Sequence, residues 1–437
     1  MAGTLIYWFR NDLRLHDNPA LASAIERCGR EGLALLPVAW HSPSAPVQTD
    51  WGFERVGPHR QAFRQQATSG LAERLRMLGS DLYVLHDPTA ESFIALARRA
   101  GAVAVVGEAI EAPEEQGEVR ALQAAGLRVK THWQSSLLPP EDLPWPSGRV
   151  PDVFTAFRQG VERASVQAPH PVQVLIQLPP WPASVQRPMA AVPVVVPAGA
   201  IDERSSFPYG LPAWQGSEAA ALDHLARYLA AGRPHTYKAT RNALTGRDFA
   251  SHWSPWLAVG SLSARQAMAA LRAFETERGA NEGTYWLWFE LLWRDHFRLL
   301  MRQHGVRLFR ALGLSRDAAR SAPRPNPAVF DRWCEGRTGL SLVDAAMREL
   351  RHTGYLSNRL RQIVASALIH DLGGDWRAGA AWFESQLIDF DVHSNQGNWA
   401  YIAGVGTDPR GGRQFNLDKQ TRDHDADGRY RRRWLSA

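Results

Sequence analysis

The sequence predicts an α/β protein with two domains, a parallel-sheet domain first and a larger all-helical domain after it. Three observations predict this organisation. The chain has 437 residues, which is more than one ordinary hydrophobic core holds. Short apolar runs alternate with amphipathic stretches over residues 4–132. Helical periodicity then dominates from Ser217 onward.

Buried strands are expected in the first domain at five short apolar runs, residues 5–9, 33–40, 81–86, 102–107 and 127–132. Between them, residues 61–79 and 112–126 have the pattern of helices. Such alternation is typical of a parallel sheet covered by helices on both faces, so residues 1–135 are predicted to form a Rossmann-like, flavodoxin-like domain. No G-x-G-x-x-G sequence follows the first strand, and an ordinary dinucleotide site is therefore not indicated there.

Residues 136–212 differ from both neighbours because prolines crowd them. This composition predicts a long inter-domain linker that packs over the surface with little regular structure, and a disordered tether is the alternative. Residues 151–162, PDVFTAFRQGVE, are less typical of a linker.

Residues 213–437 are predicted to be all-helical. Helices are expected at residues 217–232, 263–279, 283–305 and 342–354. The first of them has Ser217 as N-cap and ends at Gly232. Few strand signals interrupt this pattern.

Composition and the N-terminal sequence indicate where the protein is located and what kind of partner it binds. No long uncharged apolar run is present, so no membrane span is expected. The N-terminus has no signal-peptide pattern, and Cys28 and Cys334 make no disulfide framework, so a cytoplasmic protein is expected. The net charge of +6 favours a polyanionic partner, although a generally Arg-rich composition would produce it too. The chain has seventeen tryptophans, and composition alone does not distinguish core residues from stacking surfaces for bases or an electron relay.

The most informative segment is residues 376–406. Asp389 and Asp391 end an apolar run, and Asn395 and Trp399 follow at intervals of four residues. Carboxylates and an amide beside flat aromatic rings suit a large, flat cofactor with polar edges. The alternative, a helix end with a solvated Asp pair, accounts for each residue singly but not for the whole string.

This segment resembles the flavin-binding segment of the photolyase/cryptochrome family, and its details resemble the DASH-type cryptochromes. Residues 6–21, IYWFRNDLRLHDNPAL, resemble the start of the same family. The similarity extends over nearly the whole chain and is weakest at residues 164–200. It implies an antenna domain at residues 1–135 and an FAD-binding and DNA-lesion domain at residues 213–437.

The resemblance also implies a set of flavin-binding residues. Ala250 and His252 depart from the family, which often has Thr and a basic residue there. Ser251 and Ser254 are equally explained as helix N-caps. The implied cofactor-binding residues are Tyr237, Ser251, His252, Trp253, Ser254, Arg294, Arg361, Asp389, Asp391 and Asn395.

A second implied set binds and repairs a pyrimidine dimer. Glu290, Trp293, Asn358 and Asn395 take the catalytic positions, and an exposed ion pair of Glu290 with Arg294 is the alternative for this stretch. Gln362 and Tyr401 stand where many duplex-acting photolyases have Met and Trp. Flipping a dimer out of a duplex costs energy that a single strand does not require, so single-stranded DNA is the expected substrate. The implied DNA-binding residues are Arg241, Glu290, Trp293, Asn358, Arg359, Gln362, Tyr401 and Gln420, with Arg410, Arg413 and Lys419 as further basic residues.

Two features of the family are incomplete in this sequence. Trp399 and Trp376 match the inner residues of an electron relay, but Pro323 and Pro325 lie where the outer tryptophan is expected. Either Trp333 or Tyr355 ends the relay, or photoreduction is slow. Glu115 lies near the position where relatives bind a folate antenna, 5,10-methenyltetrahydrofolate, and a solvated acidic helix start is an equal alternative.

The leading functional hypothesis is a deoxyribodipyrimidine photo-lyase that uses FAD and blue light to split cyclobutane pyrimidine dimers in single-stranded DNA. The alternative is a DASH cryptochrome that acts as a blue-light photoreceptor or regulator with little repair. A third is a flavin-containing single-strand binder with vestigial light chemistry. A monomer without membrane contact is expected. The antenna pigment and the role in the cell stay open.

Overall fold

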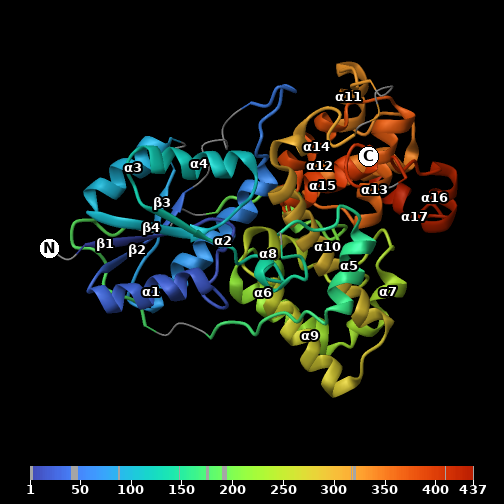
Figure 1. Ribbon diagram of the computed structural model, residues 1–437. Coiled ribbons are helices and arrows are strands. Elements are labelled where there is room, and N and C mark those ends of the chain that lie inside the picture. Colours follow the sequence, from blue (N-terminus) through green and yellow to red (C-terminus); the bar gives the residue numbers. More distant parts are fainter. Residues whose placement is uncertain are drawn as a thin grey trace.

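The computed structural model divides into a sheet-containing domain and a helical domain (Figure 1). It describes residues 3–40, 48–86, 89–146, 148–173, 177–188, 194–315, 317, 321–408 and 410–436. The predicted fold class is confirmed, because the first domain contains a parallel sheet and the second consists of helices joined by loops. None of the described helices combines the length and the apolar character that crossing a membrane requires.

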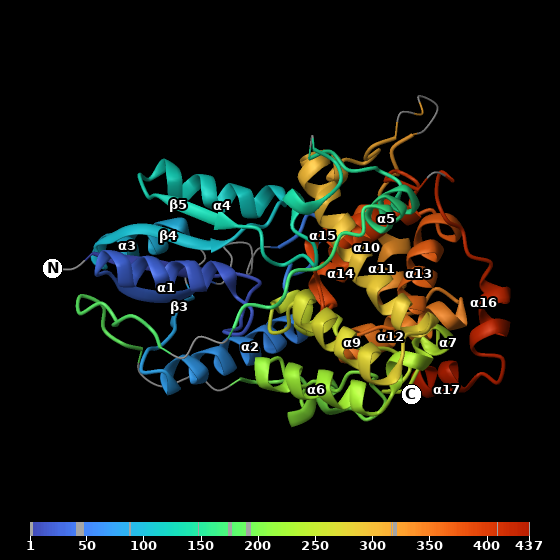
Figure 2. The same ribbon diagram turned by 60° about the horizontal axis from the view of Figure 1, so that its bottom comes forward.

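The sheet has five strands in the order β3-β2-β1-β4-β5, and every neighbouring pair is parallel. Alternate residues of the central strand face opposite sides. Leu5, Tyr7 and Phe9 pack in the same core as α1 and α2, whereas Ile6 and Trp8 pack in the core that includes residues of α3 and α4. Helices therefore cover both faces, as Figure 2 shows. The strands are β1 (Thr4–Phe9), β2 (Ala34–Trp40), β3 (Tyr83–Leu85), β4 (Ala102–Glu108) and β5 (Val129–His132).

Side-chain caps and a glycine define the ends of helices in the second domain. Asn281 caps α10 and accepts from the backbone N–H groups of Gly283 and Thr284. Ser217 caps α6 as predicted, and Gly232 follows it with a φ of 70°. The helices of the first domain are α1 (Pro19–Glu31), α2 (Pro58–Met77), α3 (Ala90–Arg99) and α4 (Pro113–Ala124). Those of the second are α6 (Glu218–Ala230), α7 (Tyr237–Thr240), α8 (Ser254–Val259), α9 (Ala264–Arg278), α10 (Glu282–His304), α11 (Pro327–Cys334), α12 (Ser341–Thr353), α13 (Asn358–Ser366), α14 (Trp376–Gln386), α15 (Val392–Ile402), α16 (Leu417–His424) and α17 (Arg429–Leu435).

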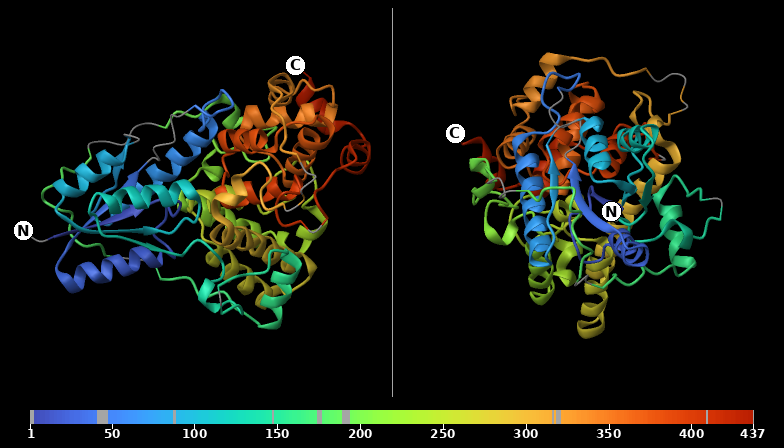
Figure 3. Two further views of the ribbon diagram at one scale, coloured as in Figure 1. Left: turned by 45° about the horizontal axis from the view of Figure 1, so that its top comes forward. Right: turned by 90° about the vertical axis from the view of Figure 1, so that its left-hand side faces the viewer.

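The segment between the domains is not a loose tether. Its described residues are mostly irregular, but they include α5 (Phe154–Arg163), which lies against α10 in the helical domain (Figure 3). Phe157, Phe207 and Tyr209 are fully buried and belong to the largest core. The disordered-tether alternative is therefore wrong for these residues, because they contribute to the hydrophobic core that holds the domains together.

The two domains are joined by direct contacts near the site. The backbone N–H of Gly57, just before α2, donates to the carbonyl of Ser385 at 2.9 Å. Arg55 pairs with Glu384 at 2.8 Å, and Arg60 donates to the Glu384 carbonyl at 3.0 Å. The end of α14, which leads into Asp389, is thus held by the sheet domain.

Candidate functional site

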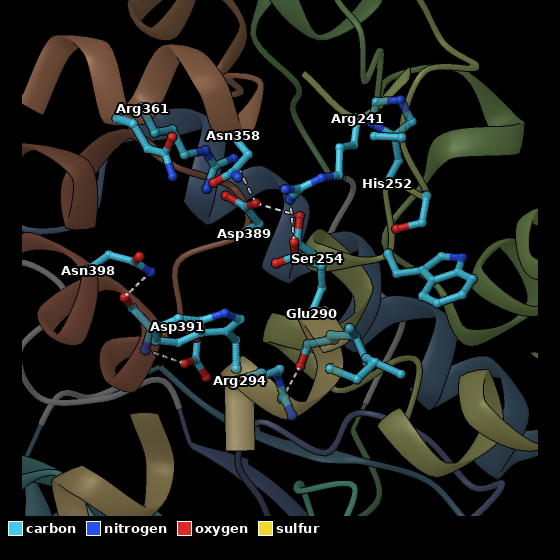
Figure 4. Close-up of a pocket in the computed structure, with 18 of the residues that line it drawn as sticks. Arg241, His252, Ser254, Glu290, Arg294, Asn358, Arg361, Asp389, Asp391 and Asn398 are labelled. Carbon is cyan, nitrogen blue, oxygen red and sulfur yellow. Dashed lines mark hydrogen bonds and ion pairs between the residues drawn. The ribbon is translucent and has the colours of Figure 1, made fainter. Parts of the chain in front are cut away.

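One cavity of about 530 Å³ opens in the helical domain, with walls from α7, α8, α10, α13 and α15. This volume lies within the range of about 300–1,000 Å³ that is usual for small-molecule sites. Figure 4 shows side chains from these helices converging on the cavity. Its lining is aromatic on several sides, and a few charged groups stand between the rings.

Asp389 is the centre of a buried charged cluster at this cavity. Arg361 Nη2 lies 2.8 Å from Asp389 Oδ2, and the hydroxyl of Ser254 donates to the same oxygen at 2.6 Å (Figure 4). Burial lowers the pKa of Arg361, but Asp389 outweighs that effect and raises it. Oδ1 of Asp389 is buried and receives no hydrogen bond within the part of the chain that the structure describes. Since a buried oxygen is rarely left without a donor, Oδ1 is suited to accept from a ligand.

Asp391 is fixed as an anion close to the same cavity. Its carboxylate caps α15 by accepting from the Ser394 N–H at 2.8 Å, and Arg298 Nη2 lies 2.8 Å from its other oxygen. Burial alone would raise the pKa of Asp391, but Arg298 and then His393 hold that pKa well below its usual range.

Arg294 brings a positive charge to the cavity wall without a counter-charge of its own. It donates to the backbone carbonyls of Ser135 and Leu257, and it pairs with no carboxylate among the described residues. Burial and then the nearby Arg298 lower the pKa of Arg294 to about 10, so the group stays protonated at neutral pH. A buried cation of this kind favours an anionic ligand in the cavity.

Five of the predicted cofactor-binding residues, Tyr237, Ser251, His252, Trp253 and Ser254, line the cavity. His252, however, turns its imidazole into an aromatic cluster, with Nδ1 2.9 Å from the Tyr355 hydroxyl and the Phe249 ring centroid at 5.0 Å. Burial lowers its pKa to about 3. His252 is therefore neutral at physiological pH and supplies no charge here.

Most of the residues predicted to meet DNA also line this cavity. Glu290 pairs with Arg241 at 2.5 Å, and the Arg241 guanidinium lies 4.2 Å from the Trp286 ring centroid. Burial raises the pKa of Glu290, and Arg241 opposes this effect. The alternative pairing of Glu290 with Arg294 is wrong, because Arg294 donates to carbonyl groups instead. Trp293, Asn358, Gln362 and Tyr401 line the cavity as well.

Asn395 does not line the cavity, although it was predicted there. Its amide donates to the Ala380 carbonyl at 3.0 Å, and Asn398 faces the cavity instead. Ser394, Asn398 and Tyr401 follow one another by four and three residues and share a face of α15 that lines the cavity, whereas the Asn395 side chain turns toward α14. The spacing from Tyr401 would have identified Asn398.

Two of the residues predicted to bind DNA, Arg359 and Gln420, lie outside the cavity lining. Arg359 donates to the Asn242 side chain at 3.0 Å, and Gln420 is buried in α16. Arg413, noted only as a basic residue, does line the cavity and donates to the Tyr401 hydroxyl at 2.6 Å. Several other lining residues were not predicted from the sequence: Trp286, Phe297, Ser394, Asn398 and Phe415.

The two tryptophans predicted to form a relay, Trp376 in α14 and Trp399 in α15, are both buried. Trp399 packs edge-on against Trp333, with ring centroids 6.2 Å apart, and a Cβ at Gly379 would lie 2.3 Å from the Trp399 ring. The indole N–H of Trp376 donates to the Ala311 carbonyl at 3.0 Å. Of the two alternative relay ends, Trp333 is therefore the one in ring contact with Trp399. Tyr355 lies in the cavity wall.

Glu115 lies in a separate cleft between the domains, beside Trp8, Trp40 and Arg10. Burial raises the pKa of its carboxyl to about 7, so the solvated-helix-start alternative does not describe it. The free volume of the cleft is about 80 Å³, which is below the range that is usual for small-molecule sites. A folate antenna stays a prediction.

Comparisons with known proteins place this geometry in context. A family model described as "FAD binding domain of DNA photolyase" matches residues 286–437, and one described as "DNA photolyase" matches residues 5–175. A protein named cryptochrome DASH from Synechocystis sp. is 41% identical over 438 residues, covering 99% of this chain and 87% of the relative. Its namesake from Xenopus laevis is 39% identical over 444 residues, covering 99% of this chain and 82% of the relative.

Solved structures extend these similarities. A cryptochrome from Synechocystis sp. PCC6803 superposes with a TM-score of 0.89 at 39% identity, covering all of this chain and 89% of that one. A bacterial class III photolyase from Agrobacterium tumefaciens superposes with a TM-score of 0.80 at 27% identity, covering all of this chain and 87% of that one.

Proposed function

Since this chain belongs to the photolyase/cryptochrome family, with the DASH-type cryptochromes as its relatives, we propose that it is a light-driven lyase that splits cyclobutane pyrimidine dimers and prefers single-stranded DNA. The observation that carries the proposal is the composition of one cavity. The Asp389–Arg361 pair lines it together with Glu290, Trp293 and Tyr401. A cofactor and a lesion would therefore lie side by side.

The chain binds FAD, and the residues around the cavity fit this group. Asp389 offers an acceptor without a donor, and Arg294 and Arg361 supply positive charge against the negative charge of the group. Ser254 fixes the orientation of Asp389, and Asp391 orders the start of α15. When bound, FAD supplies the electron that light drives into the lesion. The chain supplies binding, orientation and exclusion of water.

The lesion side supports a flipped-out pyrimidine dimer. Glu290, Asn358 and Gln362 offer hydrogen-bonding groups, and Trp293 offers a flat apolar surface. Tyr401 is tied to Arg413 and makes this wall smaller and more polar than a tryptophan would. Extracting a dimer from a duplex costs a few kcal/mol, and a wall that grips it less firmly is better matched to an already single strand.

The decisive experiment illuminates the reduced, FAD-loaded protein with single-stranded and duplex DNA that contain one dimer, and follows dimer loss. We expect rapid loss in the single strand and slow loss in the duplex. Equal rates on both substrates would contradict the assigned effect of Gln362 and Tyr401. No loss on either would contradict repair and favour the photoreceptor alternative.

Replacing Glu290 with glutamine is expected to slow dimer loss while the flavin absorbance stays normal. A hydrogen bond to a charged group contributes about 1.5–3 kcal/mol, so the dimer should bind about 10- to 150-fold more weakly. Binding titrations with the dimer-containing strand measure this change. Glu282→Gln is the control. Glu282 lies in the same helix as Glu290, its side chain is 80% exposed, and it pairs with Lys238 of α7. Loss of FAD from the Glu290 variant would show that this residue serves the cofactor instead.

A further inference from the structure

One face of the Trp293 indole is covered by a side chain from the segment between the domains. The ring of Phe154, at the start of α5, stacks on it with centroids 3.7 Å apart and planes inclined by 12°. The ring centroids of Phe297 and Tyr401 lie 5.3 Å and 5.9 Å from that of the indole. Trp293 is half-buried and lines the cavity, so the part of the indole that these rings leave free faces the cavity.

The position of Phe154 is itself fixed by bonds to α10. The Val150 N–H donates to Gln303 Oε1 at 3.0 Å, and His296 Nε2 lies 2.9 Å from the Pro151 carbonyl. His304 Nε2 lies 2.7 Å from Asp152 Oδ1. These three contacts hold the chain directly before Phe154 along more than two turns of α10.

The far end of α5 is attached to α10 as well. Arg158 donates to Glu162 and to the Tyr285 hydroxyl, and that hydroxyl donates to Glu162 at 2.8 Å. Tyr285 lies in the first turns of α10, more than 10 Å along the helix from His296. Because α5 is held at both ends, Phe154 has little freedom to move away from Trp293.

Residues 135–138, where the sheet domain passes into this segment, hold Arg294 and Asp295, the two residues that follow Trp293. The Ser135 carbonyl accepts from Arg294, and Asp295 accepts from the N–H groups of Leu137 and Leu138, each at 2.8 Å. Trp293 and Arg294, which both line the cavity, are therefore each held by the chain between residues 135 and 154. Nothing in the linker-like composition of this segment indicates such a task.

We propose that Phe154 is a positioning residue of the site: it holds the plane of the Trp293 indole so that a flat apolar ligand finds a preformed surface. The proposal rests on the proposed function, in which Trp293 meets the dimer. Ordering an aromatic side chain before binding lowers the cost of ordering it during binding. An aromatic pair of this kind contributes enough to change an equilibrium constant by about 2- to 10-fold.

The test compares the FAD-loaded wild type with Phe154→Leu, Phe154→Tyr and Phe157→Leu. Phe157 is fully buried in the same helix but stacks on Trp145 and His296 instead of Trp293, which makes it the matched control. Dissociation constants are measured in the dark for a single strand with and without one dimer. Their ratio reports how well the protein distinguishes the lesion.

We expect Phe154→Leu to reduce this ratio about 3- to 10-fold, with the affinity for the undamaged strand and the FAD content unchanged. Phe154→Tyr should restore the ratio because the ring remains, and Phe157→Leu should keep it even at lower stability. If Phe154→Leu does not retain FAD, Phe154→Met, which adapts better to the cavity, takes its place.

Two results would overturn the inference alone: a wild-type ratio in Phe154→Leu, or an equal loss in Phe157→Leu, which would show a merely structural role. A wild type that does not distinguish the dimer from undamaged DNA would overturn the proposed function, and this inference with it.

Discussion

Replacing Asp389 with alanine is expected to abolish FAD binding at micromolar concentrations and to yield a colourless protein. The change removes the carboxylate that pairs with Arg361 and accepts from Ser254. Arg361 is then left as a cation without its partner beside the cavity. Removing one partner of a fully buried pair costs about 3–5 kcal/mol, and the 23% exposure of the Arg361 side chain puts this pair at the lower end. If even the lower value appears in cofactor binding, FAD affinity falls at least about 100-fold.

Titration of the apoprotein with FAD, followed by flavin fluorescence, measures this loss. Asp425→Ala is the matched control. The Asp425 side chain is 2% exposed, and its Oδ2 lies 2.8 Å from Arg431 Nε. Neither residue lines the cavity. That variant should lose stability and keep its FAD affinity. Tight FAD binding by the Asp389 variant would show that the Asp389–Arg361 cluster does not hold the cofactor.

Glu349→Gln is expected to gain stability relative to the wild type as the pH rises. Glu349 is buried in α12 at 1% exposure and accepts from the Tyr430 hydroxyl at 2.5 Å. Burial raises its pKa from the ordinary value of 4.5 to about 8, against smaller opposing effects of Tyr430 and Arg433. Between these two values the folded protein holds a proton that the unfolded chain has lost, so each pH unit removes about 1.4 kcal/mol of stability.

The sign of this effect follows from the raised pKa. The contribution of Glu349 to stability is complete below pH 4.5 and is lost as the pH rises through about 8. The amide of glutamine does not titrate, so the difference in unfolding free energy between variant and wild type should grow by about 3–4 kcal/mol from pH 5 to pH 8.

Chemical denaturation of both proteins at several pH values measures this difference. The same replacement at Glu26, whose side chain is 76% exposed, should leave the difference constant across the range. A flat profile for Glu349→Gln would mean that Glu349 is ionised in the folded protein.

Patterns of short range predicted most of the fold. The five strands and the helices α2, α4, α6, α9, α10 and α12 all lie where apolar periodicity placed them. This succeeded because each element buries one stripe or face, and the spacing of its apolar residues records which one. The segment between the domains was harder to interpret. Its prolines concealed that Phe157, Phe207 and Tyr209 join the core, because burial of an isolated aromatic residue has no period to detect.

The candidate site, like the fold, was predicted from the sequence in part. The motifs identified residues that do line one cavity, among them Ser254, Glu290, Trp293, Arg361 and Asp389. Such motifs are local in sequence, and each helix carries its own residues to the cavity. Asn395 and Asn398 show the limit of this reasoning, since both lie in α15, but Asn395 bonds to the Ala380 carbonyl of α14 while Asn398 lines the cavity.

By itself, the sequence determined the class of fold, the helices that carry the chemistry and the types of residue that suit a flavin. Only the tertiary structure decided the partners. Arg241 reaches Glu290 across 49 positions, Ser254 reaches Asp389 across 135, and Phe154 reaches Trp293 from a segment that composition describes as a linker. The physical reason is that helix periodicity is set by neighbours along the chain, whereas ion pairs and ring stacks form where packing brings distant helices into contact.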